Sequence, residues 1–178
     1  LGYAALLDFD HKLTLNSNQG KPPVLVLGGH FENTHRDFQR IERFRAVEFE
    51  RNWNILGRPI YGHQILTDAF AELRDQRNRF LRAGLESFQI PGEYNGWMPY
   101  LNGYFKDANW HFKGNGSYLL TREPDRNSDF LRHRFLGKRR IWKLNIGYRD
   151  EHEWNRTGFS GDSLGAQSYQ FYDWETFI

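Results

Sequence analysis

The chain has 178 residues, enough for one domain with a buried core. Its formal charge of +2 gives no strong attraction to nucleic acid, and the lack of cysteine excludes disulfides, thiol catalysis and cysteine-ligated metal. No apolar run is long enough for a transmembrane helix. Aromatic residues reach 17% at a mean hydropathy of −0.78, which is typical of strands with one wet and one aromatic face. Neither end resembles a natural boundary, so we expect a fragment of a larger protein.

The first regular stretch, LLDFDHKLTL at residues 6–15, allows two interpretations. Asp8 and Asp10 follow an apolar segment with the D-x-D spacing that resembles haloacid-dehalogenase-like phosphotransferases, in which these residues are nucleophile and acid/base. That family has Thr or Ser where this chain has Lys12, and no β/α alternation follows. An alternating strand with the two aspartates and Lys12 on its polar side is the better interpretation, and the phosphatase is disfavoured.

The remainder of the first third is less regular. Residues 21–32 are expected to form a strand that is entered through two prolines. Residues 44–55 also alternate, but with charges on both faces. We therefore expect residues 1–60 to be an irregular β segment, with a periplasmic or surface extension as the alternative description.

Residues 65–88 fit two patterns. Helical spacing of apolar residues gives a helix over 67–82 as the minority interpretation. A hairpin that turns at residues 75–78 is favoured, because Gly84 costs a helix interior about 1 kcal/mol.

Strand-type alternation dominates the second half of the chain. Runs with a period of two cover residues 97–106, 110–121, 141–149 and 172–178, with a weaker run at 129–136 that places Arg132 and Arg134 on one face. Residues 61–178 are therefore expected to form an antiparallel β meander.

The connections between these runs suggest an architecture. Residues 107–109 and 137–139 are short links, whereas 122–129 and 150–167 are longer. Transmembrane β-barrels alternate short and long connections in this way and cross the bilayer with about 9–11 residues per strand. Aromatic residues at the ends of several runs suit an interfacial girdle. The expected fold is all-β, an antiparallel meander that belongs to a transmembrane β-barrel or a large extended sheet.

No catalytic or metal-binding constellation is expected, and no cofactor, because the seven histidines form neither HxH nor HExxH. The arginine series (Arg36, Arg40, Arg43, Arg45, Arg51, Arg132, Arg134, Arg139 and Arg140) is interleaved with glutamates, so internal ion pairing is expected to outweigh contact with an anionic polymer or lipid. If the chain were a soluble β-sandwich that binds a glycan, its tryptophans would supply the contacts. The candidate ligand-binding residues are Trp97, Trp110, Trp142 and Trp154, with Trp53 as a further candidate.

The segments FRAVEFERNWN, FLRAGLESF, GSYLLT, IWKLNIGYRDEHEWN and SLGAQSYQFYDWETFI resemble stretches of very large outer-membrane and cell-surface β-proteins of the Bacteroidota, foremost the translocon of type IX secretion and gliding motility. This resemblance covers most of residues 40–178. It implies an outer-membrane or cell-surface location, a non-catalytic role in transport or surface architecture, and membrane lipid and secretion subunits as partners. It carries over no individual functional residue.

Overall fold

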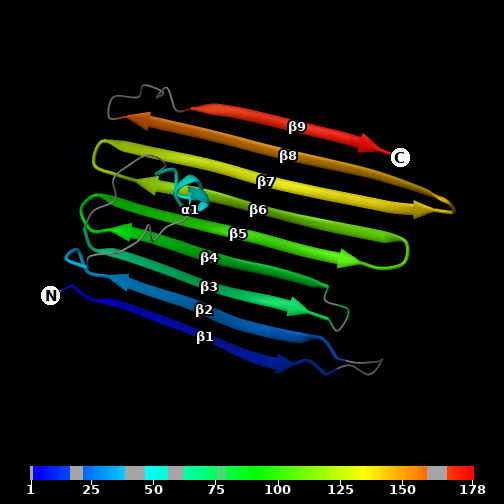
Figure 1. Cartoon of the computed structure of the whole chain (residues 1–178), viewed down its shortest axis with the longest axis horizontal. Coiled ribbons are helices and arrows are strands. Elements are labelled where there is room, and N and C mark those ends of the chain that lie inside the picture. The colour runs from blue at the N-terminus through cyan, green and yellow to red at the C-terminus, as the bar shows by residue number, and fades with distance from the viewer. Residues whose placement is uncertain are drawn as a thin grey trace.

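The computed structural model describes residues 2–16, 22–38, 47–55, 62–75, 77, 79–159 and 168–178. They form a single sheet of nine strands in chain order, each antiparallel to the next (Figure 1). The strands are β1 (Ala4–Thr14), β2 (Val24–Thr34), β3 (Gln64–Arg74), β4 (Phe80–Ile90), β5 (Tyr94–Lys106), β6 (Trp110–Arg122), β7 (Arg126–Ile141), β8 (Leu144–Phe159) and β9 (Tyr169–Phe177), and the helix is α1 (Val47–Asn52). The predicted all-β antiparallel meander is confirmed.

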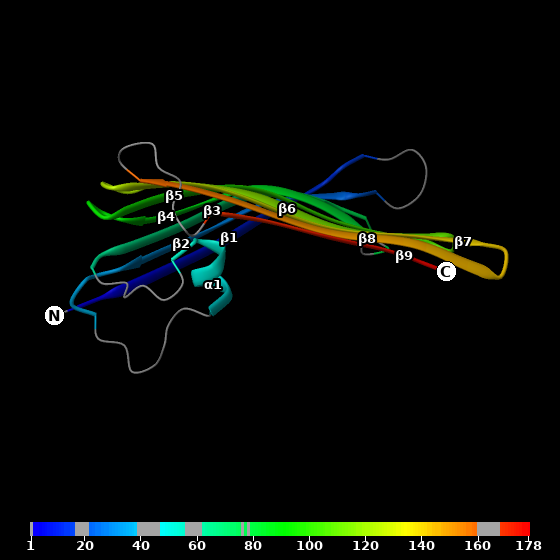
Figure 2. The same cartoon turned by 90° about the horizontal axis from the view of Figure 1, so that it is seen from above.

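The described strands make one layer, whereas a β-sandwich packs two sheets face to face. In the edge view the strands fan across one another, as expected of a twisted sheet, and α1 lies on one side of it (Figure 2). The division of the chain at residue 60 stays a prediction. In the described structure, β1 and β2 from the first sixty residues belong to the same sheet as the later strands.

The ambiguous segment 65–88 is a hairpin of β3 and β4, and the helix over 67–82 is wrong. Asp75 fixes the turn because its Oδ1 accepts hydrogen bonds from the backbone amides of Arg77 (2.8 Å) and Arg79 (3.0 Å). Such aspartate turns compete with helix formation.

Two predicted boundaries in the second half are wrong. Residues 137–139 lie inside β7, and the turn is Trp142–Lys143. Most of 150–167 belongs to β8, which runs to Phe159. In β8, Glu151 and Glu153 lie on one face and pair with Arg134 and Arg132 of β7, which allows this charged stretch to remain in a strand. The predicted alternation of short and long connections is wrong in part, since β5–β6 and β6–β7 are both joined by three residues, 107–109 and 123–125.

Residues 44–46 lie outside the described residues, but 47–52 are helical rather than extended. A helix of six residues is marginal alone, so packing must hold it. Asn54 ends it in the left-handed conformation (φ 54°), and Ile55 N donates to Glu50 O at 2.8 Å, which satisfies a carbonyl of the last turn.

The strand register divides the side chains between two faces, because directly paired residues share a face. We call the face that contains Asp8 the polar face and the face that contains Leu7 the apolar face. The polar face carries Asp8, Asp10, Lys12, His30, Glu32, Asp68, Glu72, Arg74, Arg82, Glu86, Lys113, Arg132, Arg134, Arg149, Glu151, Glu153, Asp173 and Glu175. The apolar face carries exposed Leu7, Phe9, Leu13, Leu27, Phe31, Leu73, Leu81, Leu85, Trp97, Leu101, Phe135, Leu144, Ile146, Tyr148, Tyr172 and Trp174.

The buried core lies on the polar face, at one end of the strands, beneath α1. Its members are Trp53, Ile55, Phe88, Ile90, Tyr94, Met98, Leu119 and Phe130, with Phe49 and Leu66 packed against them. The large apolar surface on the other side of the sheet takes no part in this core.

The β5–β6 turn contains a pH-sensitive group. Asp107 Oδ1 accepts from the amides of Asn109 (2.8 Å) and Trp110 (2.7 Å), and these bonds lower the pKa of Asp107 below its usual 3.8. Because the pKa of Asp107 is lowered in the folded protein, the stabilisation is complete above the usual pKa and is lost as the pH falls through the lowered value.

We expect Asp107→Ala to accelerate amide exchange at Asn109 and Trp110 several-fold near neutral pH and to abolish this acid dependence. Asp107→Asn, which keeps an acceptor, should retain part of the protection; equal exchange in all three proteins would contradict it.

Candidate functional site: the polar face and its docked helix

Ion pairs run across the polar face from strand to strand. Glu72 on β3 is 2% exposed at its side chain and receives Arg74 Nε and Arg82 Nε, each at 2.7 Å. The Arg82 guanidinium also lies 4.1 Å from the centroid of the Phe70 ring. Glu72 is thus a buried carboxylate with two cations, the arrangement that allows a charge to be removed from water.

The same pattern continues over β7, β8 and β9. Arg134 Nε donates to Glu151 Oε1 at 2.6 Å, and Arg149 pairs with Glu175. Internal pairing, as predicted for the arginine series, is therefore confirmed for Arg51, Arg132 and Arg134, while Arg40, Arg43 and Arg45 lie outside the described residues.

A hollow of about 840 Å³ lies along these ion pairs. Its lining includes Arg82, Asn102, Tyr104, Lys113, Arg134 and Glu151. The lining offers both hydrogen-bond donors and acceptors, which suits a wet surface that contacts polar solutes.

Gly84 allows the side chain of Tyr100 to lie across the neighbouring strand. Tyr100 on β5 reaches over Gly84 on β4, where a Cβ atom would lie 2.5 Å from the tyrosine ring. The Tyr100 hydroxyl donates to Asp68 Oδ1 on β3 at 3.0 Å. Any larger residue at position 84 would displace this contact, so Gly84 is required for a polar link that spans three strands.

Aromatic packing holds α1 to the sheet. Trp53 is 1% exposed and Phe88 is fully buried. Their ring centroids are 5.7 Å apart, and Phe49 meets Phe88 edge-on at 5.2 Å. The Tyr94 hydroxyl donates to Trp53 O at 2.6 Å. Rings at these distances and angles attract one another beyond simple burial.

Glu153 is the polar anchor of the helix. Its side chain is 5% exposed and receives Arg51 Nη2 from α1 at 3.0 Å. Arg132 Nε lies 2.7 Å away without hydrogen-bond alignment, so that contact is an ion pair. Tyr169 donates its hydroxyl to the other carboxylate oxygen at 3.0 Å, and Arg132 Nη1 donates to Asn52 Oδ1 at 2.6 Å. The carboxylate thus joins α1, β7, β8 and β9.

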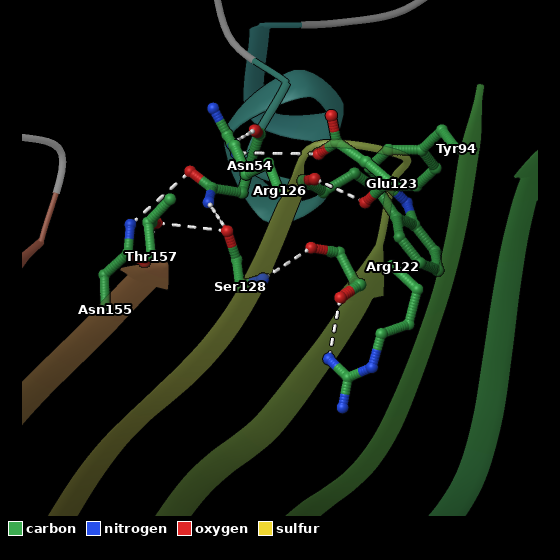
Figure 3. A network of polar contacts seen from close by, with 10 residues as sticks. Asn54, Tyr94, Arg122, Glu123, Arg126, Ser128, Asn155 and Thr157 are labelled. Carbon is green, nitrogen blue, oxygen red and sulfur yellow. Dashed lines mark hydrogen bonds and ion pairs between the residues drawn. The ribbon is translucent and has the colours of Figure 1, made fainter. Parts of the chain in front are cut away.

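Beside it, Asn54 inserts into a network of buried hydroxyl and amide groups (Figure 3). Asn54 Nδ2 donates to Ser128 Oγ at 3.1 Å, and Ser128 Oγ contacts Thr157 Oγ1 at 3.0 Å. Arg126 Nη2 donates to Asn54 O at 3.0 Å. The end of the helix is therefore fixed by side chains from β7 and β8, which lie more than seventy residues further along the sequence.

The tryptophans proposed as ligand-binding residues do not converge. Trp97 and Trp154 lie on the apolar face near the end of the strands that carries α1, and Trp110 lies on the same face near the opposite end. Trp142 occupies the β7–β8 turn with 88% of its surface exposed. Trp53 is in the core. The first three therefore lie at the two ends of one apolar surface, as an aromatic girdle would.

The apolar face has one polar interruption near its middle. His133 and His152 face each other with ring centroids 5.4 Å apart, and His133 Nδ1 lies 3.3 Å from Asp150 Oδ2. Asp150 is 7% exposed. The carboxylate is thus paired and shielded by its neighbours.

Glycines hollow the apolar face beside this interruption. A depression of about 720 Å³ includes Gly103, Gly114 and Gly116 in its lining. Leu81, Leu101 and Phe135 surround them. Small residues here leave space for an apolar chain or ring from outside the described sheet.

Asp8 and Asp10 lie on the polar side of β1, as the strand interpretation predicted. Asp8 contacts His30 Nδ1 at 2.6 Å and Asp10 pairs with Lys12 at 3.4 Å. The all-β meander differs from the β/α alternation that the phosphatase interpretation requires. Within the described ranges, no three His, Asp or Glu side chains are arranged to hold a metal ion.

Sequence reasoning missed the residues that hold α1. Glu153 and Asn54 look like ordinary solvated polar residues in the sequence. Only the packing of α1 against β7 and β8 brings Glu153 to Arg51 and Asn54 to Ser128.

No protein-family model, curated protein or solved structure matches this chain. No helix in the part of the chain that the structure describes is long and apolar enough to cross a membrane.

Proposed function

We propose that this chain is a wall segment of a bacterial outer-membrane β-barrel, with a non-catalytic role in transport or surface architecture. The observation that carries the proposal is the division of one sheet into an exposed apolar face and an ion-paired polar face. In water, an apolar surface that extends over nine strands would be unfavourable and prone to association. Against lipid it is the surface that a barrel needs, and the polar face then lines the interior.

Strand dimensions support the proposal. On β5 the apolar-face run extends from Trp97 to Phe105, which covers the about 9–11 residues that a tilted transmembrane strand needs. Most charged residues on this face lie toward the strand ends, with Arg122, Asp129 and Arg156 at one end and Arg139 at the other. The exception is Asp150 near the middle, which is 7% exposed and lies beside His133.

The two sheet edges support it as well. Within the described residues β1 pairs only with β2, and β9 only with β8. Both edges are long and expose Phe9 and Trp174 on the apolar face. Unprotected edges of this kind associate with further strands, and a barrel satisfies them by closure.

In this proposal α1 lies inside the barrel. The helix narrows one end of the interior, and the hollow of about 840 Å³ lined by Arg82 and Lys113 remains open to polar solutes. The partners are then outer-membrane lipid and other membrane or secretion subunits, in keeping with the resemblance to Bacteroidota surface proteins.

Detergent partitioning and electrophoresis test the proposal. We expect the chain to partition into detergent micelles and to migrate differently before and after boiling. A monodisperse monomer in plain buffer, without detergent, would contradict it.

A matched pair of substitutions on β5 tests which face meets lipid. Leu101→Arg places a charge on the apolar face near the middle of the strand, and Asn102→Arg places the same charge on the polar face. We expect the first to lower the free energy of unfolding in lipid vesicles by about 2–4 kcal/mol. The second should change it by less than about 1 kcal/mol, since surface substitutions are usually tolerated.

The free energies of unfolding of both variants are measured in vesicles by urea titration, with the folded fraction read from the electrophoretic band of the unboiled protein. An equal response of the two proteins would mean that both faces are wet and would reject the lipid-facing assignment.

A further inference from the structure

The β7–β8 hairpin projects beyond its neighbours. Trp110, the first residue of β6, is opposite Arg139, and Phe177, the last residue of β9, is opposite Gly147. Residues 141–145 therefore extend past both flanking strands, and Figure 1 shows the hairpin reaching further than the β5–β6 turn. We call residues 139–145 the β7–β8 tip.

The tip is basic and has no acidic partner in the described part of the chain. Arg139, Arg140 and Lys143 are all exposed, and none forms an ion pair with a described carboxylate. The Arg139 guanidinium lies 4.6 Å from the Trp110 ring centroid, which orients it at the end of the apolar face. Within the described residues, Arg139 and Arg140 therefore lack the internal ion pairs that Arg132 and Arg134 form.

The tip also exposes apolar groups among its charges. Ile141 is 45% exposed, Leu144 is 54% exposed and Trp142 is 88% exposed. Ile141 and Leu144 lie on the apolar face, so this surface continues without a break into the basic tip.

Trp142 adopts a backbone conformation that favours glycine. Its φ is 58°, at the first position of a two-residue hairpin turn, where glycine is the usual choice. A bulky residue in this region is strained by about 1–3 kcal/mol. Since the ring is almost fully exposed, the described residues offer little packing to offset that cost, and a contact outside the sheet is the simplest compensation.

We infer that the β7–β8 tip binds the anionic headgroups of a phospholipid bilayer, with Arg139, Arg140 and Lys143 on the phosphates and Trp142 in the interfacial layer. Cations at the rim of an apolar surface lie at the depth of lipid phosphates. An indole ring prefers the same layer. A binding site for nucleic acid would need the cations but would not explain the adjoining Ile141 and Leu144, which favour a lipid surface.

The inference goes beyond the proposed barrel wall and is tested separately from it. Because the chain has no cysteine, Asn145→Cys gives one attachment site for a fluorescent probe at the tip. The probe is quenched in vesicles that contain headgroup spin-labelled phosphatidylglycerol or, in parallel, headgroup spin-labelled phosphatidylcholine. We expect stronger quenching by the anionic lipid, with a preference that high salt reduces.

Neutralising the tip should remove the preference. In the triple variant Arg139→Gln, Arg140→Gln and Lys143→Gln, the selectivity for the anionic lipid should fall by about five-fold per cation and ~100-fold in total. Trp142→Ala should instead weaken quenching by both lipids to the same degree. The matched control Arg36→Gln, Arg122→Gln and Arg156→Gln removes the same charge from the opposite end of the sheet and should keep the selectivity.

Three outcomes overturn the inference. The first is equal quenching by both lipids in the parent protein, and the second is an equal loss of lipid selectivity in both triple variants. The third is loss of quenching when short double-stranded DNA is added, because the tip would then bind DNA in preference to the vesicles. Resistance of the chain to alkaline extraction from the same vesicles reports membrane insertion. Insertion without lipid selectivity rejects the headgroup site at the tip and retains the barrel wall. Lipid selectivity without insertion retains the headgroup site and rejects the barrel wall.

Discussion

Trp53→Ala is expected to release α1 from the sheet. Trp53 is 1% exposed and packs on Phe49 and Phe88. Truncation of a buried tryptophan costs about 3–5 kcal/mol, and a six-residue helix has no comparable stability of its own. The nine strands should persist, because none of their backbone hydrogen bonds depends on the indole.

Amide hydrogen exchange measures this release. The amides of residue 53 and Ile55 bond to Phe49 O and Glu50 O, and both should exchange at least a hundred-fold faster in the variant, since about 2.7 kcal/mol corresponds to that factor. Trp97→Ala is the matched control, because Trp97 is 42% exposed on the apolar face. Unchanged protection of Ile55 in Trp53→Ala would show that the helix is held by other contacts.

Glu153→Gln is expected to release α1 to a similar extent, because it removes the negative charge of a buried carboxylate. The substitution keeps the shape of the side chain but leaves the Arg51 and Arg132 cations facing a neutral amide in a site where the carboxylate is 5% exposed. Removing one partner of a buried ion pair costs about 3–5 kcal/mol. Release of α1 lets Arg51 return to water, so we expect the helix to undock before the sheet unfolds.

Glu151→Gln is the control for this substitution. Glu151 lies on the same strand and face, but its side chain is 30% exposed and its partner Arg134 is 48% exposed. Exposed pairs contribute about 0–1 kcal/mol. Limited proteolysis within the α1 segment and amide exchange at Ile55 compare the two proteins. Equal protection in Glu153→Gln and Glu151→Gln would mean that the Glu153 carboxylate does not anchor the helix.

The predictability of the fold varied along the chain for physical reasons. Strands with a clean period of two, such as β5 and β6, could be placed from sequence because one face is apolar. The long β7 and β8 could not be bounded correctly, since Arg134 and Glu151 resemble loop residues until the register shows that they pair. The helix was missed because its six residues are stabilised by Phe88 and Glu153, which come from distant strands.

The candidate site was less predictable than the fold. Large amphipathic tryptophans suggest ligand contacts in the sequence, but the register spreads three of them along the apolar face. The ion pairs of the polar face depend on which strands are neighbours, and single-strand patterns carry no such information.

Site-directed spin labelling on β5 tests the assignment of the two faces most directly. The parent chain contains no cysteine, so single cysteines can be placed in turn at Leu101, Asn102, Tyr104 and Phe105 and labelled in lipid vesicles. We expect labels at Leu101 and Phe105 to be relaxed mainly by oxygen, which concentrates in the bilayer, and labels at Asn102 and Tyr104 mainly by a water-soluble nickel chelate. Equal access of the nickel chelate to all four positions would contradict a lipid-facing apolar surface.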